Sequence, residues 1–116
     1  MRFKINNIML ADTATLADLG FDSANALTEL CEHFGIKQLG IFGSAARQHD
    51  FGQDSDVDLL VEFKPSANKA QQYFGFLEAL EALLARKVDL IEPSALRNPY
   101  VLASIEQDKQ TLYAAT

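Results

Sequence analysis

The sequence contains few of the residues that build disulfide frameworks or nitrogen- and sulfur-based metal sites. It has one cysteine, Cys31, and two histidines, His33 and His49, among 116 residues. One cysteine excludes a disulfide framework and a cysteine zinc cluster within the chain, and it is typical of proteins in a reducing cytosol. Two histidines are too few for a histidine-rich metal site. We therefore expect a cytoplasmic protein.

A long hydrophobic run and an excess of positive charge are also missing. The N-terminal stretch MRFKINNIMLAD contains two positive charges but no unbroken apolar run, so we predict neither a signal peptide nor a membrane span. The net charge of -6 and the isoelectric point near 4.7 repel a phosphate backbone, which argues against direct nucleic-acid binding. A basic protein partner, or an anionic ligand bridged by a metal ion, fits this charge better.

The chain is long enough for one domain and too short for two. With 116 residues and 48% hydrophobic composition it can bury a single core, and it contains no internal repeat or low-complexity segment. Phe3 and Ile5 alternate with polar residues as in a short strand, and Asp12 is placed to cap a brief helix. We predict an N-terminal extension of uncertain structure at 1–21 and one folded domain at 22–116.

From Ser23 onward, hydrophobic periodicity predicts alternating helices and strands. The aromatic residues Tyr73, Phe74 and Phe76 are expected to pack in the core. Strands separated by helices predict an α/β domain with helices packed on one sheet. The expected elements are, in chain order, a helix from Ser23 to Gly35, a strand over 37–43, a strand over 55–63, a long helix capped by Ser66 with an inward stripe of Tyr73, Leu77, Leu80 and Leu84, a strand over 87–93, a helix opened by Asn98 and Pro99, and a strand over 110–114.

Two aspartates interrupt one of these hydrophobic strands. Asp56 and Asp58 are two residues apart in SDVDLLVEF, so strand alternation puts both carboxylates on one face, about 6 to 7 Å apart at the backbone. Neighbouring carboxylates repel each other and aspartate is a poor strand former, so a cation between them would be needed to favour the arrangement. Such oxygen ligands suit Mg²⁺, with Mn²⁺ as the alternative. The simpler interpretation is an exposed edge strand whose aspartates only prevent association between sheets.

The turn before these aspartates has the composition of a phosphate-binding turn. Gly43 permits a close backbone approach to a ligand, and Ser44 opens the segment SAARQ, which can form one helical turn with free N–H groups pointing at an anion. Arg47 is placed to pair with a phosphate. Taken separately, the glycine and serine also fit an ordinary strand-to-helix turn, and an arginine on an exposed helix is more often only solvated.

A third aspartate interrupts another predicted strand. Asp89 lies between Val88 and Leu90 in KVDLI. If this strand neighbours the strand of Asp56 and Asp58, three carboxylates converge beside the phosphate-binding turn. Such a set can hold two metal ions about 3.5 to 4 Å apart, which clamp the attacking and leaving oxygens of an in-line phosphoryl displacement.

Four segments together resemble a known family from Ile36 to the C-terminus. GSAAR, SDVDLLV, VDLIEP and NPYVLASIEQDKQTLYA resemble the minimal nucleotidyltransferases, the MNT family of the polymerase-beta superfamily. The resemblance implies a polymerase-beta-like nucleotidyltransferase fold, α/β with helices packed on a mixed sheet. It also implies a reaction in which a hydroxyl attacks the α-phosphate of ATP or another nucleoside triphosphate and pyrophosphate is released.

The resemblance assigns roles to the residues at matching positions. Gly43 and Ser44 would hold the nucleoside triphosphate, next to Arg47, whose phosphate-binding role was inferred from the turn itself. The metal ligands and catalytic residues would be three aspartates, the last of which would also help to deprotonate the acceptor hydroxyl: Asp56, Asp58 and Asp89.

The resemblance also implies a partner. Many proteins of this family are antitoxins encoded beside a helical HEPN-type ribonuclease toxin, which they silence by transferring AMP to a tyrosine. Three features of this sequence depart from the family pattern: the loop between Ser44 and Asp56 is slightly longer, Gln48 replaces a common glycine, and residues 1–21 have no clear counterpart. None of these departures removes a metal ligand, so they do not exclude activity.

Three functions compete on this basis. The first is Mg²⁺-dependent transfer of AMP from ATP to a hydroxyl of a partner protein, such as a HEPN-type toxin encoded next to it. The second is the same chemistry on a small-molecule acceptor, such as an aminoglycoside-like hydroxyl compound. The third is a non-catalytic antitoxin that neutralises a basic toxin by contact alone, which the net charge of -6 would permit. The sequence leaves the base preference and any homo- or hetero-oligomer open.

Overall fold

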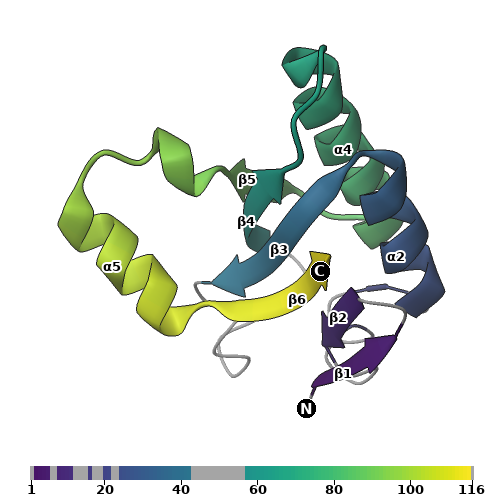
Figure 1. Cartoon of the computed structure of the whole chain (residues 1–116), viewed down its shortest axis with the longest axis horizontal. Coiled ribbons are helices and arrows are strands. Elements are labelled where there is room, and N and C mark those ends of the chain that lie inside the picture. Colours follow the sequence, from purple (N-terminus) through teal and green to yellow (C-terminus); the bar gives the residue numbers. More distant parts are fainter. Residues whose placement is uncertain are drawn as a thin grey trace.

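One six-stranded sheet with helices packed on it organises the chain (Figure 1). The structure is a computed structural model, and it describes residues 2–5, 8–11, 16, 20–21, 24–42 and 57–115. Its elements are β1 (Arg2–Ile5), β2 (Ile8–Ala11), α2 (Ala24–His33), β3 (Ile36–Phe42), β4 (Val57–Phe63), α4 (Lys69–Leu84), β5 (Val88–Ile91), the 3-10 helix η1 (Pro93–Ala95), α5 (Pro99–Asp108) and β6 (Gln110–Ala115).

The strands lie in the order β1-β2-β6-β3-β4-β5. β4 and β5 are parallel, whereas the other neighbouring strands are antiparallel. The parallel pair follows from α4, which crosses over between the two strands and returns the chain to the same end of the sheet. The prediction of a mixed sheet with helices packed on it is therefore confirmed.

The N-terminal segment contributes strands to the same sheet. β1 pairs with β2, and β2 pairs with β6 through partners such as Ile8 and Ala115. The short strand expected at Phe3 and Ile5 is thus confirmed. Most of the helix expected from Asp12 lies outside the described residues, although Leu16 is helical and buried. The division of the chain after residue 21 stays a prediction.

The core lies between the helices and one face of the sheet. α2 packs against β3 and β6, and α4 packs against β5. Strand alternation brings every second residue of the central strands to this face, where burial of aliphatic side chains stabilises the fold. The core residues are Leu16, Phe21, Leu27, Cys31, Ile36, Leu39, Ile41, Val57, Leu59, Val61, Phe76, Leu80, Leu84, Val88, Leu90, Leu112 and Tyr113.

Asparagine side chains cap the two C-terminal α-helices. Asn98 accepts a hydrogen bond from the backbone N–H of Tyr100, and Pro99 is the first helical residue, as predicted. The cap of α4 is Asn68, which accepts from the backbone N–H of Gln71 at 3.1 Å. The prediction of Ser66 was wrong, because its hydroxyl accepts from the N–H of Asn68 instead and so orders the turn before the helix.

The inward stripe of α4 consists of Phe76, Leu80 and Leu84, spaced four residues apart. The expected stripe included the two leucines, and the expectation that Phe76 packs in the core is confirmed. Tyr73 is half-buried. Phe74, which we also expected in the core, is 64% exposed. It lies two positions before Phe76 and therefore points to the opposite side of the helix.

Candidate functional site

Asp58 and Asp89 lie side by side on the parallel pair of strands. They are direct partners in the register of β4 and β5, and neighbouring strands of a sheet are about 4.8 Å apart. Residues in register project from the same face, so both carboxylates lie on one side of the sheet. Asp58 is half-buried and Asp89 is exposed. The strand of Asp89 is therefore the neighbour of the strand of Asp58, as the proposed chemistry requires.

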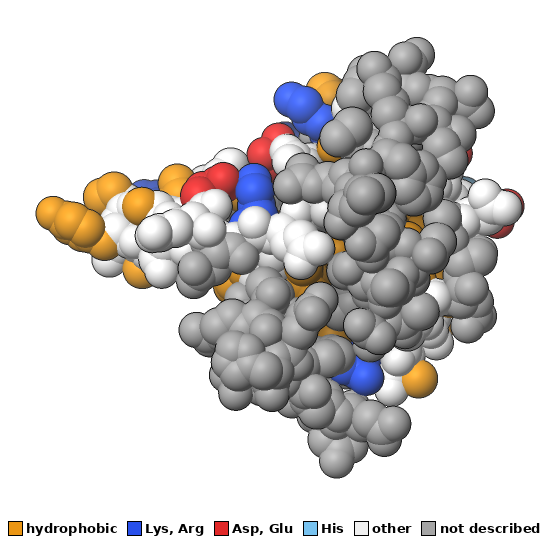
Figure 2. Space-filling model, turned by 90° about the horizontal axis from the view of Figure 1, so that it is seen from below, with side chains coloured by type: hydrophobic (Ala, Val, Ile, Leu, Met, Phe, Trp, Pro, Cys, Tyr) orange, Lys and Arg blue, Asp and Glu red, His pale blue; other side chains and the backbone are white. Residues whose placement is uncertain are grey.

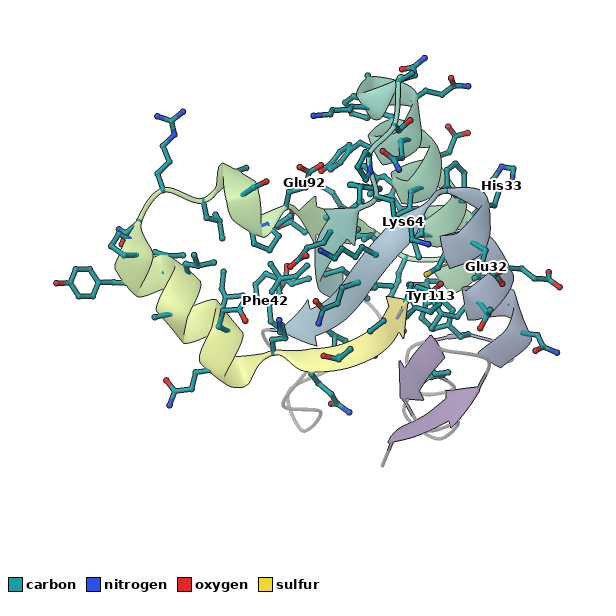
Figure 3. All side chains as sticks on the ribbon, viewed as in Figure 1. Glu32, His33, Phe42, Lys64, Glu92 and Tyr113 are labelled. Carbon is teal, nitrogen blue, oxygen red and sulfur yellow. The ribbon has the colours of Figure 1, made fainter. Side chains whose placement is uncertain are left out.

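The two aspartates lie on the face of the sheet that α2 and α4 do not cover, called here the open face. Val57 and Leu59, which flank Asp58, are buried in the core, so Asp58 projects the other way. On its other side, Asp58 is paired in register with Phe42, which is labelled at the end of β3 in Figure 3. A row of Phe42, Asp58 and Asp89 thus crosses three strands of the open face.

The other predicted site residues lie between β3 and β4. β3 ends at Phe42 and β4 begins at Val57, and the connecting segment 43–56 lies outside the described residues. The two described residues that flank this segment both lie beside Asp58. Phe42 is the register partner of Asp58, and Val57 precedes Asp58 in the chain. The roles of the remaining residues stay predictions: Gly43, Ser44, Arg47 and Asp56.

Two side chains of α4 hold the strand that carries Asp89. The hydroxyl of Tyr73 donates a hydrogen bond to the carbonyl of Leu90, and the N–H of Val88 donates to the carboxylate of Glu81 at 3.0 Å. β5 is an edge strand, and both bonds satisfy polar groups of the residues next to Asp89. They therefore fix the backbone at Asp89 from the side opposite to β4.

This support of β5 was missed in the sequence. From the sequence, Tyr73 was placed in the apolar stripe of the helix. The one signal of another role was its phenolic hydroxyl, because a buried hydroxyl needs a hydrogen-bond partner. Burial, followed by the negative charges of Asp89 and Glu92, raises the pKa of Tyr73 above its ordinary value. The hydroxyl therefore stays protonated and remains a donor to Leu90 in neutral solution.

The paired carboxylates fit a divalent cation. Adjacent carboxylates repel each other unless a cation lies near them, and hard oxygen donors suit Mg²⁺ or Mn²⁺. Within the described part of the chain there is no group of three or more His, Cys, Asp or Glu side chains placed to hold a metal ion. Of the three predicted metal ligands, the described residues bring together two, Asp58 and Asp89, and leave the rest of a metal shell to other oxygen donors.

Comparison with protein families decides the class of this fold. The sequence profile of the nucleotidyltransferase domain matches residues 24–112, which include every element from α2 to the start of β6. The chain belongs to the nucleotidyltransferase domain family. The nucleotidyltransferase is thus an enzyme of the class expected from the sequence, and the open-face row of Phe42, Asp58 and Asp89 lies within the matched region.

Relatives and solved structures support the same family. This nucleotidyltransferase is 44% identical over 72 residues to the protein adenylyltransferase MntA of Thermococcus cleftensis, covering 60% of this chain and 69% of that protein. It is also similar to a solved structure described as a minimal nucleotidyltransferase, with a TM-score of 0.64 and 31% identity. The match covers 76% of this chain and 87% of the other. The predicted resemblance to the minimal nucleotidyltransferases is confirmed.

A third similarity shows the fold alone. A solved complex of a tri-AMPylated HEPN toxin of Shewanella oneidensis with its MNT antitoxin matches with a TM-score of 0.56 at 15% identity, covering 87% of this chain and 73% of the other. Among the described residues, no helix is both long and apolar enough to cross a membrane. The expected α/β nucleotidyltransferase fold is confirmed by the solved minimal nucleotidyltransferase described above.

Proposed function

We propose that this nucleotidyltransferase transfers AMP from ATP to a hydroxyl group of a partner protein in the cytoplasm, with Mg²⁺ as its cofactor. The observation that carries the proposal is the register pairing of Asp58 with Asp89 on the open face of the sheet. Both residues lie on paired strands, so the register of the sheet, and not a loop, sets the spacing of their backbones. Such preorganised oxygen donors are what phosphoryl transfer needs, because its catalysis is mostly positioning and charge stabilisation.

Every site residue has a task in the proposed step, and Asp89 has two. Asp58 and Asp89 would hold Mg²⁺ together with Asp56, and Gly43 and Ser44 would hold the triphosphate, as the family resemblance implies. Arg47 would pair with a phosphate, a role that follows from its place in the turn after Gly43. The acceptor oxygen forms a bond to the α-phosphorus, the bond from the α-phosphorus to the oxygen bridging to the β-phosphate breaks, and pyrophosphate leaves. The proton of the acceptor hydroxyl passes to the carboxylate of Asp89. Bound Mg²⁺ supplies charge neutralisation at the phosphates.

The choice of a protein acceptor rests on relatives. The MntA protein is named as a protein adenylyltransferase, and the MNT antitoxin of the solved complex is bound to an AMPylated HEPN toxin. A HEPN-type toxin encoded beside the present protein is therefore the acceptor that we propose. The net charge of -6 suits a basic protein surface.

Label transfer from ATP tests this function. The purified protein is incubated with α-labelled ATP, Mg²⁺ and the purified product of the neighbouring gene, and we expect label on that product. Asp58→Asn and Asp89→Asn should each abolish labelling. Glu62→Gln is the matched control, because Glu62 lies on the same face of β4 two side-chain pairs further along and is not part of the proposed site; it should label normally.

Other outcomes point to other functions. Pyrophosphate release with a small hydroxyl compound, without label on the protein, would replace the protein acceptor by a small molecule. Neutralisation of the neighbouring toxin by the Asp58→Asn and Asp89→Asn variants, without label transfer by the parent, would contradict the proposed mechanism and favour inhibition by contact alone.

A further inference from the structure

α5 is a helix whose apolar side chains find little cover in the chain. Tyr100 is 85% exposed and Val101 is 45% exposed. Leu102 and Ile105 are only half-buried, and none of the described side chains of this helix is buried. Figure 2 shows hydrophobic side chains gathered at the projecting end of the molecule formed by this helix. α5 therefore contributes little to the core while presenting large apolar groups to the solvent.

The sequence nevertheless specifies this helix strongly. Asn98 accepts hydrogen bonds from the N–H groups of Tyr100 and Val101 at 2.9 and 3.4 Å, and Pro99 occupies the first helical position. A helix of 10 residues is marginal in water unless an apolar face is covered. A local start signal thus forms a helix that the described residues cover only in part, at Leu102 and Ile105.

The place of α5 connects it to the open face. The chain runs from Asp89 on β5 through η1 into α5, and then into β6, which pairs with β3. η1 lies against β4, the strand of Asp58. α5 accordingly projects beside the sheet that carries both aspartates (Figure 1). A macromolecule seated on α5 is held next to the face on which Asp58 and Asp89 lie.

The surroundings of α5 are acidic. β4 and residues 88–115 together contain six acidic and two basic residues. One of the two basic residues, Lys109, is paired with Glu106 at 3.0 Å. Bound nucleotide would add further negative charge to the open face. The surface that complements this region is therefore cationic around an apolar centre.

We infer that the exposed apolar edge of α5, formed by Tyr100 and Val101, is the docking edge for the acceptor protein, which presents an apolar cleft rimmed by lysine and arginine. The inference rests on the proposed function, and it adds where the acceptor is held. Tyrosine at the centre of an interface carries a large share of binding energy, because its ring buries a wide apolar area with little loss of side-chain entropy. A second copy of the chain fits less well, since its acidic surface would meet the same acidic surface.

The double variant Tyr100→Ala with Val101→Ala tests the inference. The double variant keeps Asn98 and Pro99, which start α5. Alanine is also a better helix former than tyrosine or valine, so the helix should still form. We expect the dissociation constant of the purified neighbouring-gene product, measured by calorimetry without nucleotide, to rise at least about tenfold. The KM for that acceptor in label transfer should rise similarly, whereas the KM for ATP should stay unchanged. Raising the ionic strength should weaken binding of the parent protein.

Phe74→Ala is the matched control, because Phe74 is a large exposed aromatic residue on α4. It should bind and label the acceptor like the parent protein. Parental affinity and KM in the double variant would overturn the docking inference while leaving the proposed function intact. Absence of label transfer by the parent, with binding still lost in the double variant, would overturn the function and keep the docking edge. A parent protein that self-associates through α5, with a monomeric double variant, would also overturn the inference.

Discussion

The two faces of the central sheet have opposite uses, although the same strands build both. On β4, Leu59 and Val61 face α2 and α4 and are buried, whereas Asp58 and Glu62 face the open side and are half-buried. Alternation along one strand thus places Asp58 on the face opposite to Leu59 and Val61, although Leu60, which lies on the same face as Asp58, is also buried. Substitutions on the covered face should therefore change the free energy of unfolding, whereas substitutions of Asp58 and Asp89 on the open face should change activity.

The largest effect is expected on the covered face. Phe76 is fully buried and contacts the rings of Phe34 and Phe63. Phe76→Ala should lower the free energy of unfolding by about 3 to 5 kcal/mol, because it removes a buried ring and leaves a cavity. Urea unfolding measures this loss. Phe74→Ala, on the opposite side of the same helix, should change it by less than about 0.5 kcal/mol; equal losses would contradict the separation.

A smaller effect is expected at Gly75 of α4, which lies close to the ring of Phe34, the residue after α2. A Cβ at this position would lie 2.7 Å from Cε1 of Phe34. Gly75→Ala should destabilise the protein by about 1 kcal/mol, since the strain of overpacking exceeds the gain in helix propensity. In a Phe34→Leu background the same change should be neutral or stabilising. A double-mutant cycle by urea unfolding checks this coupling, and additive effects would contradict it.

Removing the two asparagine caps in turn compares how much α4 and α5 each contribute to the free energy of unfolding. Asn68→Ala should lower global stability by about 1 kcal/mol, because α4 covers the core. Asn98→Ala removes a similar cap from α5, where no described side chain is buried. It should speed amide hydrogen exchange in α5 while changing the global unfolding free energy by less than about 0.5 kcal/mol. A global loss as large as that of Asn68→Ala would mean that α5 stabilises the fold.

The smallest effect is expected on the stability of the folded protein in alkaline solution. Burial is the main cause that raises the pKa values of Cys31, Tyr73 and Tyr113 in the folded protein. The unfolded chain therefore releases these protons at lower pH than the folded chain, and the stability falls as the pH rises above the ordinary values of 9.0 for the thiol and 10.0 for the phenols. Unfolding at a series of pH values measures the slope. In Cys31→Ala the decline should begin at higher pH, and an unchanged profile would contradict the assignment.

Local patterns predicted much of the fold and of the site. Alternation in SDVDLLVEF placed Asp58 opposite to the buried face, and Asn98 with Pro99 marked the start of α5, because each depends only on neighbouring residues. The cap of α4 was predicted at Ser66, but Asn68 lies two residues later and can also cap a helix, and which of the two does so depends on the turn. Asn68 is the residue that the structure places at the cap.

Features that depend on distant residues were beyond the sequence. The hydrogen bond from Tyr73 to Leu90 joins a helix to an edge strand and requires the crossover of α4 to be known. The exposure of the apolar residues of α5 is also a tertiary property, because it depends on which distant segments pack against the helix. The pairing of Asp58 with Asp89 was conditional for the same reason, since strand order cannot be read from either strand alone.

The most direct test asks whether Asp58 and Asp89 bind the metal-nucleotide complex. Melting temperatures are measured for the parent, Asp58→Asn, Asp89→Asn and Glu62→Gln, each with and without Mg²⁺ and a non-hydrolysable ATP analogue. Ligand that binds only the folded state raises the melting temperature. We predict a rise for the parent and for Glu62→Gln and none for the two aspartate variants. An equal rise in all four proteins would show that the paired aspartates do not hold the metal-bound nucleotide.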